Sequence, residues 1–192
     1  MRILRAADHR RMPWKNNKGM TTQIAVFPQG AGLDDFAWRI STAGVVEDGA
    51  FSIFPGIDRT LSVLRGEGIE LHVAKEEPAI LVNDSAPFAF PADAQTHATL
   101  LSGPITDLNV MTRRGAFRHS VQRITLEGES ALDCDAETTL LLCHTGSLKL
   151  TIGGDKVELS PLDAVLLPQG THIDIDGRPA ASFFTIALDP VA

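Results

Sequence analysis

Apolar and polar residues alternate with a period of two along most of the chain. The alternation is clear in TQIAVFP (22–28), LSVLRG (61–66), IELHVA (69–74), ITLEG (124–128), LKLTIGG (148–154) and KVELSP (156–161). This period is typical of strands with one buried face. Short Gly, Pro and Asp clusters separate the stretches, and GGD at 153–155 predicts a tight hairpin turn. No segment shows a convincing helical period, and the sequence allows at most a short helical turn within 130–137, so the pattern predicts an all-β fold.

The order of strands and turns repeats once along the chain. The matching segments are VLRGEGIELHV (63–73) with LCHTGSLKLTI (142–152), FAFPAD (88–93) with VLLPQG (165–170), and LNVMT (108–112) with TIALD (185–189). Glycine turn, alternating strand, proline turn and final strand follow one another as in a cupin-type jelly roll. We therefore predict a bicupin with two cupin-like barrels, residues 1–114 and residues 115–192.

The final strand of the repeat differs between the two halves. Side chains two positions apart share a strand face, which places Asp107, Asn109 and Met111 together. The aligned residues of the second half are Phe184, Ile186 and Leu188. Burying an Asp or Asn without partners costs about 1–3 kcal/mol. If this face points inward, the first barrel has a polar cavity and the second, degenerate barrel has a packed core. The alternative is that Asp107 and Asn109 face solvent.

Composition narrows the classes of partner. The 192 residues carry a formal net charge of −7, so we expect no nucleic-acid partner, while a local basic pocket for a small anion stays open. Apolar runs fall short of the roughly 20 residues that span a bilayer. The N-terminus MRILRAADHRRMPW lacks the apolar segment of a signal peptide. With Cys134 and Cys143 as buried thiols, we expect a soluble cytoplasmic protein.

Metal and nucleophile chemistry have little support in the sequence. A cupin metal site uses an HxH pair, a nearby carboxylate and a distant His, and none of the six histidines forms HxH. LPQGTH (167–172) resembles part of a second cupin motif, yet His144 and His172 would supply two ligands at most. Neither cysteine lies beside a basic motif, and GxSxG is absent. We expect no metal, no cofactor and no assigned catalytic residue.

The stretch FSIFPGIDRT (51–60) is the strongest candidate for anion binding. Pro55 and Gly56 predict a turn that enters the first strand of the repeat. A guanidinium matches a carboxylate in a bidentate manner, so Arg59 is a candidate ligand, with Phe51 and Phe54 as apolar wall. The alternative is structural, with an ion pair between Asp58 and Arg59 that holds the turn.

Two further segments offer polar groups to a carboxylate. MPWKNNKGMTT (12–22) lacks the Walker spacing but places Lys15 and Asn16 near hydroxyl groups. The alternative for this segment is a solvated loop. In AWRIS (37–41), Arg39 reaches an anion if its face lines the barrel mouth, and it is exposed and structural if Trp38 packs into the core.

Four segments in order resemble the HutD/Ves family: PWKNNKGMTTQIA, FAWRISTAGV, GAFSIFPGIDRTLSVLRGEG and DLNVMTRR, within about residues 13–114. One departure is that Asn17 and Lys18 replace two glycines of the family motif W-K-N-G-G-G-T-T. The resemblance implies a bicupin without the standard metal site. It also implies a role in histidine utilisation through binding of an intermediate such as N-formyl-L-glutamate or urocanate. The ligand-binding residues it implies are Trp14, Lys15, Asn16, Trp38, Arg39, Phe51, Phe54, Arg59, Asp107 and Asn109.

Three hypotheses of different classes follow. The first is a small-molecule binding protein that governs a metabolic pathway. The second is a metal-independent isomerase or hydrolase, with Asp107 as general base and His72 as the other acid or base. The third is an interaction scaffold that forms a homodimer through sheet edges.

Overall fold

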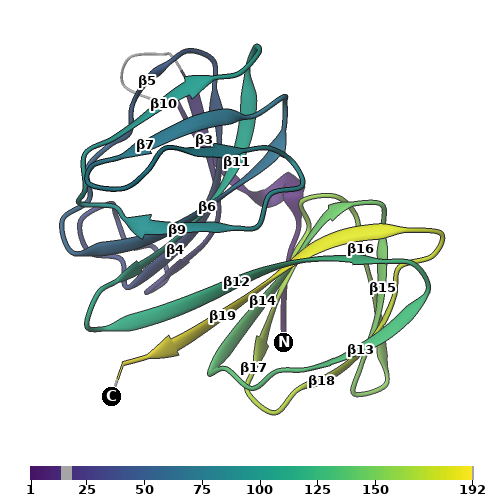
Figure 1. Cartoon of the computed structure of the whole chain (residues 1–192). Coiled ribbons are helices and arrows are strands. Elements are labelled where there is room, and N and C mark those ends of the chain that lie inside the picture. Colours follow the sequence, from purple (N-terminus) through teal and green to yellow (C-terminus); the bar gives the residue numbers. More distant parts are fainter. Residues whose placement is uncertain (14–18, 192) are drawn as a thin grey trace. The chain divides into compact units, whose positions relative to one another are not determined.

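The computed structural model describes residues 1–13 and 19–191, which are almost entirely β-structure (Figure 1). The strands are β1 (Arg2–Leu4), β2 (Arg10–Pro13), β3 (Gly19–Phe27), β4 (Trp38–Val45), β5 (Gly49–Ala50), β6 (Ile57–Arg65), β7 (Ile69–Val73), β8 (Ala79–Leu81), β9 (Phe88–Pro91), β10 (Thr96–Leu100), β11 (Ile105–Arg113), β12 (Phe117–Leu126), β13 (Glu129–Asp133), β14 (Thr138–Thr145), β15 (Leu148–Ile152), β16 (Asp155–Leu159), β17 (Ala164–Pro168), β18 (His172–Asp176) and β19 (Ala181–Pro190). The all-β prediction is confirmed. The sequence allows at most a short helical turn within 130–137, and none is formed: β13 ends at Asp133, residues 134–137 are irregular, and a 3-10 turn lies at Ala6–Asp8.

The chain forms two compact units. The first unit contains residues 10–118, and the second unit contains residues 1–9 and 119–192. The N-terminal segment belongs with the second unit because β1 pairs antiparallel with β17. The sequence had placed that segment in a first domain of residues 1–114, since nothing local to it reveals a partner so far along the chain.

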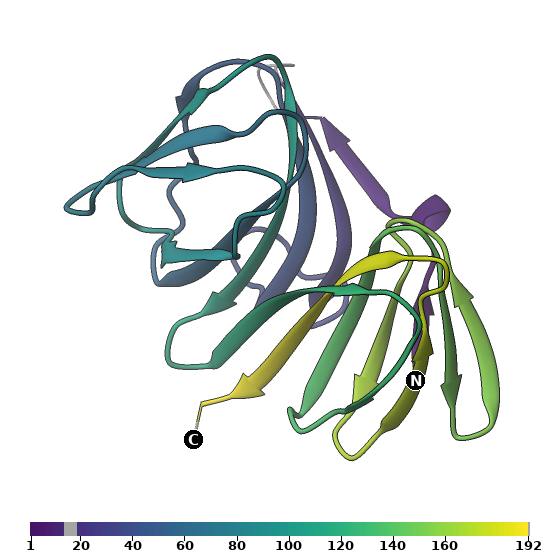
Figure 2. The same ribbon diagram turned by 45° about the vertical axis from the view of Figure 1, so that its right-hand side comes forward.

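The first unit consists of two facing sheets (Figures 1 and 2). One has the order β2-β3-β4-β11-β6-β9, and the other has the order β5-β10-β7-β8. Inward apolar residues of both sheets make one core cluster: Val45, Leu61, Val63, Ile69, Leu71, Val73, Leu81, Phe90, Ala98 and Ile105. A second cluster contains Phe36, Ile57, Ala92 and Met111.

The second unit has a larger uninterrupted core. Its sheets run β1-β17-β14-β19-β12 and β13-β18-β15-β16. Fourteen buried residues from the two sheets and their connections form one cluster, which includes Leu141, Leu167 and Phe183. Cys134 and Cys143 are free, buried thiols within it, as predicted. Among the described residues, strand pairing does not join the two sheets of either unit into a closed barrel.

The two units repeat one strand arrangement. Strands β4 to β11 of the first unit and strands β12 to β19 of the second have the same order in their sheets. The order β4-β11-β6-β9 corresponds to β12-β19-β14-β17. The order β5-β10-β7-β8 corresponds to β13-β18-β15-β16. Gly66 and Gly146 occupy matching turns. A Cβ would lie 2.6 Å from the Pro104 carbonyl oxygen at Gly66 and 2.4 Å from the Ala180 carbonyl oxygen at Gly146, and φ is positive at both.

Strand register corrects the alignment of the final strand. Asp107 lies opposite Val63 in the first unit, and Phe183 lies opposite Cys143 in the second. In both strand pairs, the register shifts by one residue directly beside these paired positions. The structural counterpart of Asp107 is therefore Phe183 rather than Phe184, because a shift of one residue moves a side chain to the other face.

The tight hairpin predicted at GGD is present. Ile152 pairs with Asp155, which leaves Gly153 and Gly154 as a two-residue turn with positive φ at both positions. In the part of the chain that the structure describes, no helix is long and apolar enough to cross a membrane.

Candidate functional site

A group of polar side chains interrupts the apolar interior of the first unit. We call it the interior polar patch, and it comprises Gln23, Arg39, Ser41, Arg59, Asp107 and Asn109. Cross-strand register places these residues on one face of the six-stranded sheet. Arg39 and Arg59 both lie opposite Met111, while Ser41 lies opposite both Gln23 and Asn109. Val45, Leu61 and Val63 share this face and belong to the core, so the face is inward.

Asn109 connects the two charged groups of opposite sign. The Nε and Nη2 groups of Arg59 both donate to Asn109 Oδ1, with Nε at 2.8 Å. Asn109 Nδ2 in turn donates to Asp107 Oδ1 over 2.6 Å, and the Ala43 amide donates to the same oxygen over 3.2 Å. The result is a continuous buried chain of hydrogen bonds that orients one edge of the guanidinium.

Aromatic rings flank the Arg59 guanidinium. Its Cζ lies 4.5 Å from the centroid of Phe51 and 5.6 Å from that of Phe90. Phe90 is opposite Arg59 on the neighbouring strand β9. Such cation–π contacts stabilise a cation that is removed from water. With Nε and one side of Nη2 engaged by Asn109, the Nη1 edge is the part of the fork suited to another acceptor.

Arg39 is the second buried cation of the patch. Its side chain is 6% exposed, against 8% for Arg59, and its Nε donates to Gln23 Oε1 over 3.1 Å. Burial lowers the pKa of Arg39, and burial lowers the pKa of Arg59 to about 10, with Asp107 opposing that shift. Burial also raises the pKa of Asp107 to about 6, although Arg59 and the hydrogen bond from Asn109 favour its ionised form.

The structure brings five of the predicted site residues together. Arg39, Phe51, Arg59, Asp107 and Asn109 all contribute to the interior polar patch or contact it. The alternative that Asp107 and Asn109 face solvent is wrong, because they are 1% and 4% exposed. The structural alternative, an ion pair between Asp58 and Arg59, is also not formed: Asp58 accepts from Arg114 at 2.7 Å.

Two predicted residues lie elsewhere in the first unit. The ring of Phe54 packs edge-on against Phe36 in the second apolar cluster, with the centroids 6.4 Å apart. Trp38 lies on the opposite face of β4 from Arg39 and stacks on Phe27. Both faces of β4 are buried, so Trp38 and Arg39 are buried on opposite faces. The sequence-based alternatives, in which only one of the two is buried, are therefore both wrong.

Trp14, Lys15 and Asn16 fall outside the described residues, as do Asn17 and Lys18. Their predicted role in ligand binding stays a prediction.

Sequence reasoning missed Gln23, Ser41 and Phe90. Phe90 and Phe88 alternate on a short strand, and this pattern indicates that Phe90 is buried. It does not reveal that the Phe90 ring contacts Arg59. Gln23 was hidden by a register shift between Gln23 and Ala25, which breaks the simple alternation of β3.

The three histidines that the sequence singled out do not join the interior polar patch. His72, the second candidate acid or base, is exposed and faces Glu70 with Nε2 3.3 Å from a carboxylate oxygen. His172 contacts Asp133 on the surface of the second unit, and His144 contacts Arg123. Within residues 1–13 and 19–191, no group of three or more His, Cys, Asp or Glu side chains is placed to hold a metal ion.

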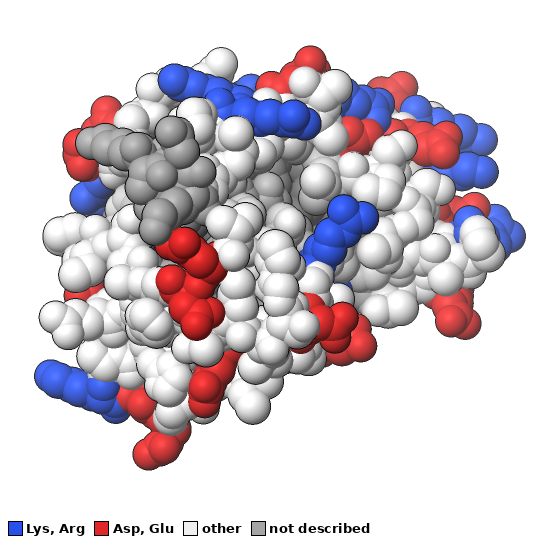
Figure 3. Space-filling model, turned by 90° about the horizontal axis from the view of Figure 1, so that it is seen from above, with Lys and Arg blue, Asp and Glu red and all other residues white. Residues whose placement is uncertain are grey.

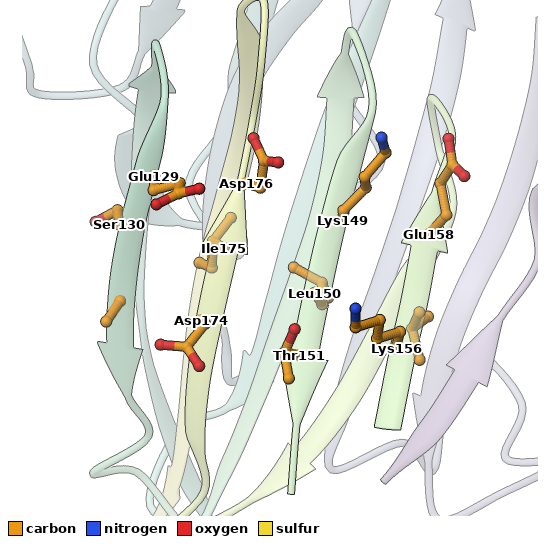
Figure 4. Close-up of a pocket in the computed structure, with 12 residues that line it drawn as sticks. Glu129, Ser130, Lys149, Leu150, Thr151, Lys156, Glu158, Asp174, Ile175 and Asp176 are labelled. Atoms are coloured by element: carbon orange, nitrogen blue, oxygen red, sulfur yellow. The ribbon is translucent and has the colours of Figure 1, made fainter. Parts of the chain in front are cut away.

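A shallow hollow lies on the second unit. It has a volume of about 760 Å³ and lies over the sheet β13-β18-β15-β16, where Lys149 and Lys156 lie across from Asp174, Asp176 and Glu129 (Figure 4). A second hollow of about 590 Å³ lies near Asp93 in the first unit. The face in Figure 3 shows acidic side chains interspersed with basic ones rather than a field of one sign. Buried opposite charges therefore distinguish the interior polar patch from these exposed surfaces.

Comparison with known proteins identifies the family. Residues 6–184 match the family HutD. The chain belongs to the HutD family. It is 35% identical to an uncharacterized 21.2 kDa protein in the hutC 3′ region of Pseudomonas putida, over 93% of this chain and 94% of that protein. It is 37% identical to protein Ves of Citrobacter koseri, over 60% of this chain and 61% of that protein. The names HutD and hutC associate the family with a histidine-utilisation locus.

Solved structures agree with this assignment. A conserved protein of unknown function from Pseudomonas aeruginosa PAO1 superposes with a TM-score of 0.90 at 38% identity, covering 98% of each chain. HutD from Pseudomonas fluorescens SBW25, in a formate condition, superposes with a TM-score of 0.84 at 32% identity, covering 100% and 99%. A cupin 2 conserved barrel domain protein from Leptotrichia buccalis superposes at 0.61 with 11% identity, covering 93% and 92%. The fold is therefore cupin-like.

Proposed function

We propose that the chain is a small-molecule binding protein that holds a carboxylate metabolite at the interior polar patch and governs histidine utilisation. The observation that carries the proposal is the imbalance of buried charge. Two guanidinium groups face the interior and one carboxylate accompanies them. Charged side chains are rarely buried without opposite charge. An anion that binds Arg39 and Arg59 would supply the missing charge.

The geometry favours a carboxylate as that anion. The planar fork of Arg59 matches two carboxylate oxygens, and Asn109 and Phe51 restrict its rotation before a ligand arrives. The ring of Phe51 adds the apolar wall that small-ligand sites use for the hydrocarbon part of a metabolite. Formate is the simplest carboxylate and is named with the P. fluorescens HutD structure. N-formyl-L-glutamate and urocanate are the pathway metabolites to test first.

Calorimetric titration tests the proposal directly. Chelator-treated protein is titrated with N-formyl-L-glutamate, urocanate, glutamate and formate. We expect saturable binding of one pathway metabolite at micromolar affinity, a free energy of about −8 kcal/mol. Arg59→Met should remove the binding, whereas Arg59→Lys should retain part of it, because the charge stays and the fork is lost.

Arg65→Met is the matched control, since Arg65 is on the same strand but exposed. Circular dichroism of each variant establishes that the fold is retained. Unchanged affinity in folded Arg59→Met would overturn the assignment of the site.

The raised pKa of Asp107 favours an enzyme as the second candidate function. A carboxyl group with a pKa of about 6 suits proton transfer near neutral pH. The candidate reaction is isomerisation or hydrolysis of a small anionic metabolite without metal. Incubation of chelator-treated protein with each metabolite, followed by NMR, tests it. Turnover that disappears in Asp107→Asn would favour the enzyme, and a ligand that binds and returns unchanged would favour the binding protein.

We also propose that each unit corresponds to one cupin-type barrel, so that the chain is a bicupin. The repeated strand order of the two units supports this assignment. A homodimer formed through sheet edges is a further proposal, and light scattering across a range of concentrations tests it. A strict monomer at high concentration would remove it.

A further inference from the structure

The interior polar patch contains three ionisable side chains. Arg39, Arg59 and Asp107 come from β4, β6 and β11, which are adjacent in one sheet. Their formal charges sum to one positive charge when Asp107 is ionised, and to two when it is protonated. The negative charge of a ligand that the patch can neutralise therefore depends on whether Asp107 is protonated.

The other buried residues that the structure describes around Asp107 are uncharged. Strand β3 contributes Thr21 and Gln23 to this face, and β9 contributes Phe88 and Phe90. The facing sheet contributes Ile69, Leu71, Val73, Thr96 and Ala98. The edge strand β2 adds Arg10 opposite Gln23, but Arg10 is exposed. Within the described part of the chain, Arg39 and Arg59 are thus the buried charged groups that face Asp107 from the elements packed around it.

Asp107 is coupled to Arg59 through a short and buried path. Asn109 bridges the two side chains, with 2.8 Å to Arg59 Nε and 2.6 Å to Asp107 Oδ1. An anion on the Nη1 edge of Arg59 would share this interior with the carboxylate, where charge–charge repulsion is screened less than in water. Burial already raises the pKa of Asp107 to about 6, so its proton is accessible near neutral pH.

We propose that Asp107 determines the charge of the anion that the interior polar patch accepts. With the Asp107 carboxylate ionised, the patch takes a singly charged carboxylate. A doubly charged carboxylate enters together with one proton, which binds the Asp107 carboxylate oxygen and comes from the solvent. The inference rests on the proposed function, and it assigns to Asp107 the role of a residue that determines specificity.

Two ligands of nearly the same shape separate charge from fit. N-formyl-L-glutamate carries two carboxylates, and N-formyl-L-glutamine replaces the side-chain carboxylate by an amide. Calorimetry from pH 5.5 to pH 8 should show the affinity for the dianion falling by up to about tenfold per pH unit above pH 6. The affinity for the monoanion should change by less than about threefold over that range. At pH 7.5, buffers of different ionisation enthalpy should report uptake of about one proton per dianion bound.

Asp107→Asn isolates the carboxylate. The amide oxygen can still accept from Asn109 and Ala43, so the change removes the charge with little change of shape. We expect the variant to bind the dianion more tightly than the unmodified protein at pH 8, by up to about a hundredfold, and to lose the pH dependence. Asp48→Asn is the control, because Asp48 is an exposed carboxylate that accepts from the Leu100 amide in the same unit. This control should keep the pH dependence.

The outcomes distinguish the two proposals. If neither ligand binds at any pH, and other carboxylates also fail, the proposed function falls and the inference with it. If both ligands bind without proton uptake, and Asp107→Asn behaves as the unmodified protein, the inference is overturned while the proposed function stands.

Discussion

The two units of this chain share one backbone plan and differ in what they bury. Strand order and register match, so that Arg59, Asp107 and Asn109 of the first unit correspond to Thr139, Phe183 and Thr185 of the second. In the second unit, Phe183 belongs to the core cluster, and Thr139 and Thr185 are uncharged. In the first unit, a buried network of charges and amides takes their place.

The comparison shows whether the fold requires a charged residue at the position of Asp107. The second unit shows that this sheet packs with hydrocarbon at the key position, since Phe183 is 2% exposed. A buried charge at this position is therefore not required by the backbone plan. Burying charge is costly even when it is hydrogen-bonded, and this cost is the physical reason for assigning the function to the first unit.

The largest expected effect comes from exchanging the core residue of the second unit for its counterpart. Phe183→Asp places a carboxylate among apolar side chains with no Asn or Arg to receive it. We expect the free energy of unfolding to fall by about 4 kcal/mol or more, or the protein not to fold. Urea unfolding followed by circular dichroism measures this, with Phe183→Leu as control at about 1 kcal/mol. A loss below 1 kcal/mol for the Asp variant would mean that the two interiors are not distinct.

Removal of the bridging amide tests the first unit. Asn109→Leu removes the hydrogen bonds that Asn109 makes with Arg59 and Asp107 in the interior. The expected loss in free energy of unfolding is about 2–4 kcal/mol. The counterpart change Thr185→Val should cost less than about 1 kcal/mol, because no charged group depends on the half-buried Thr185 hydroxyl. Equal losses at the two positions would contradict the assignment of a coupled network to the first unit.

The pH dependence of stability should also differ between the interiors. The pKa of Asp107 is raised in the folded protein, so its contribution to stability is complete below about pH 4 and is lost as the pH rises through about 6. Asp107→Asn lacks this titration. From about pH 4 to pH 7, the free energy of unfolding of the unmodified protein should therefore fall by on the order of 2 kcal/mol relative to the variant.

Other carboxylates act in the opposite direction but cancel in this comparison. Hydrogen bonds from Arg114 and Arg178 lower the pKa values of Asp93 and Asp176, respectively, so their contributions to stability are lost as the pH falls. Both proteins carry these groups. A pH-independent difference between the two unfolding curves would show that Asp107 does not titrate in this range.

The smallest effect is expected on the outer face of the second unit. Arg178 donates to Glu129 and Asp176, yet its side chain is 60% exposed. Exposed ion pairs contribute little because water screens them. Arg178→Ala should leave the midpoint of urea unfolding nearly unchanged and should not alter ligand affinity. A marked loss of stability would mean that the charged hollow in Figure 4 has a structural role.

Local patterns in the sequence were sufficient for much of the fold. Alternation located the strands β6, β7, β15 and β16 and the turn at Gly153 and Gly154, because strand faces and tight turns depend on neighbours in sequence. The same alternation put Asp107 and Asn109 on one face, and the repeat placed the glycine turns in order. Family resemblance rested on motifs of the same local kind.

Only the tertiary structure decided which faces are buried and which side chains meet. A register shift of one residue exchanges the faces of a strand, which is why the sequence paired Asp107 with Phe184 when Phe183 is its counterpart. Arg59 meets Phe90 and Asn109 through strand pairing between distant segments, and Asp58 finds Arg114 in the same way. Such contacts depend on which strands are neighbours in the sheet, and that information is absent from any single stretch of sequence.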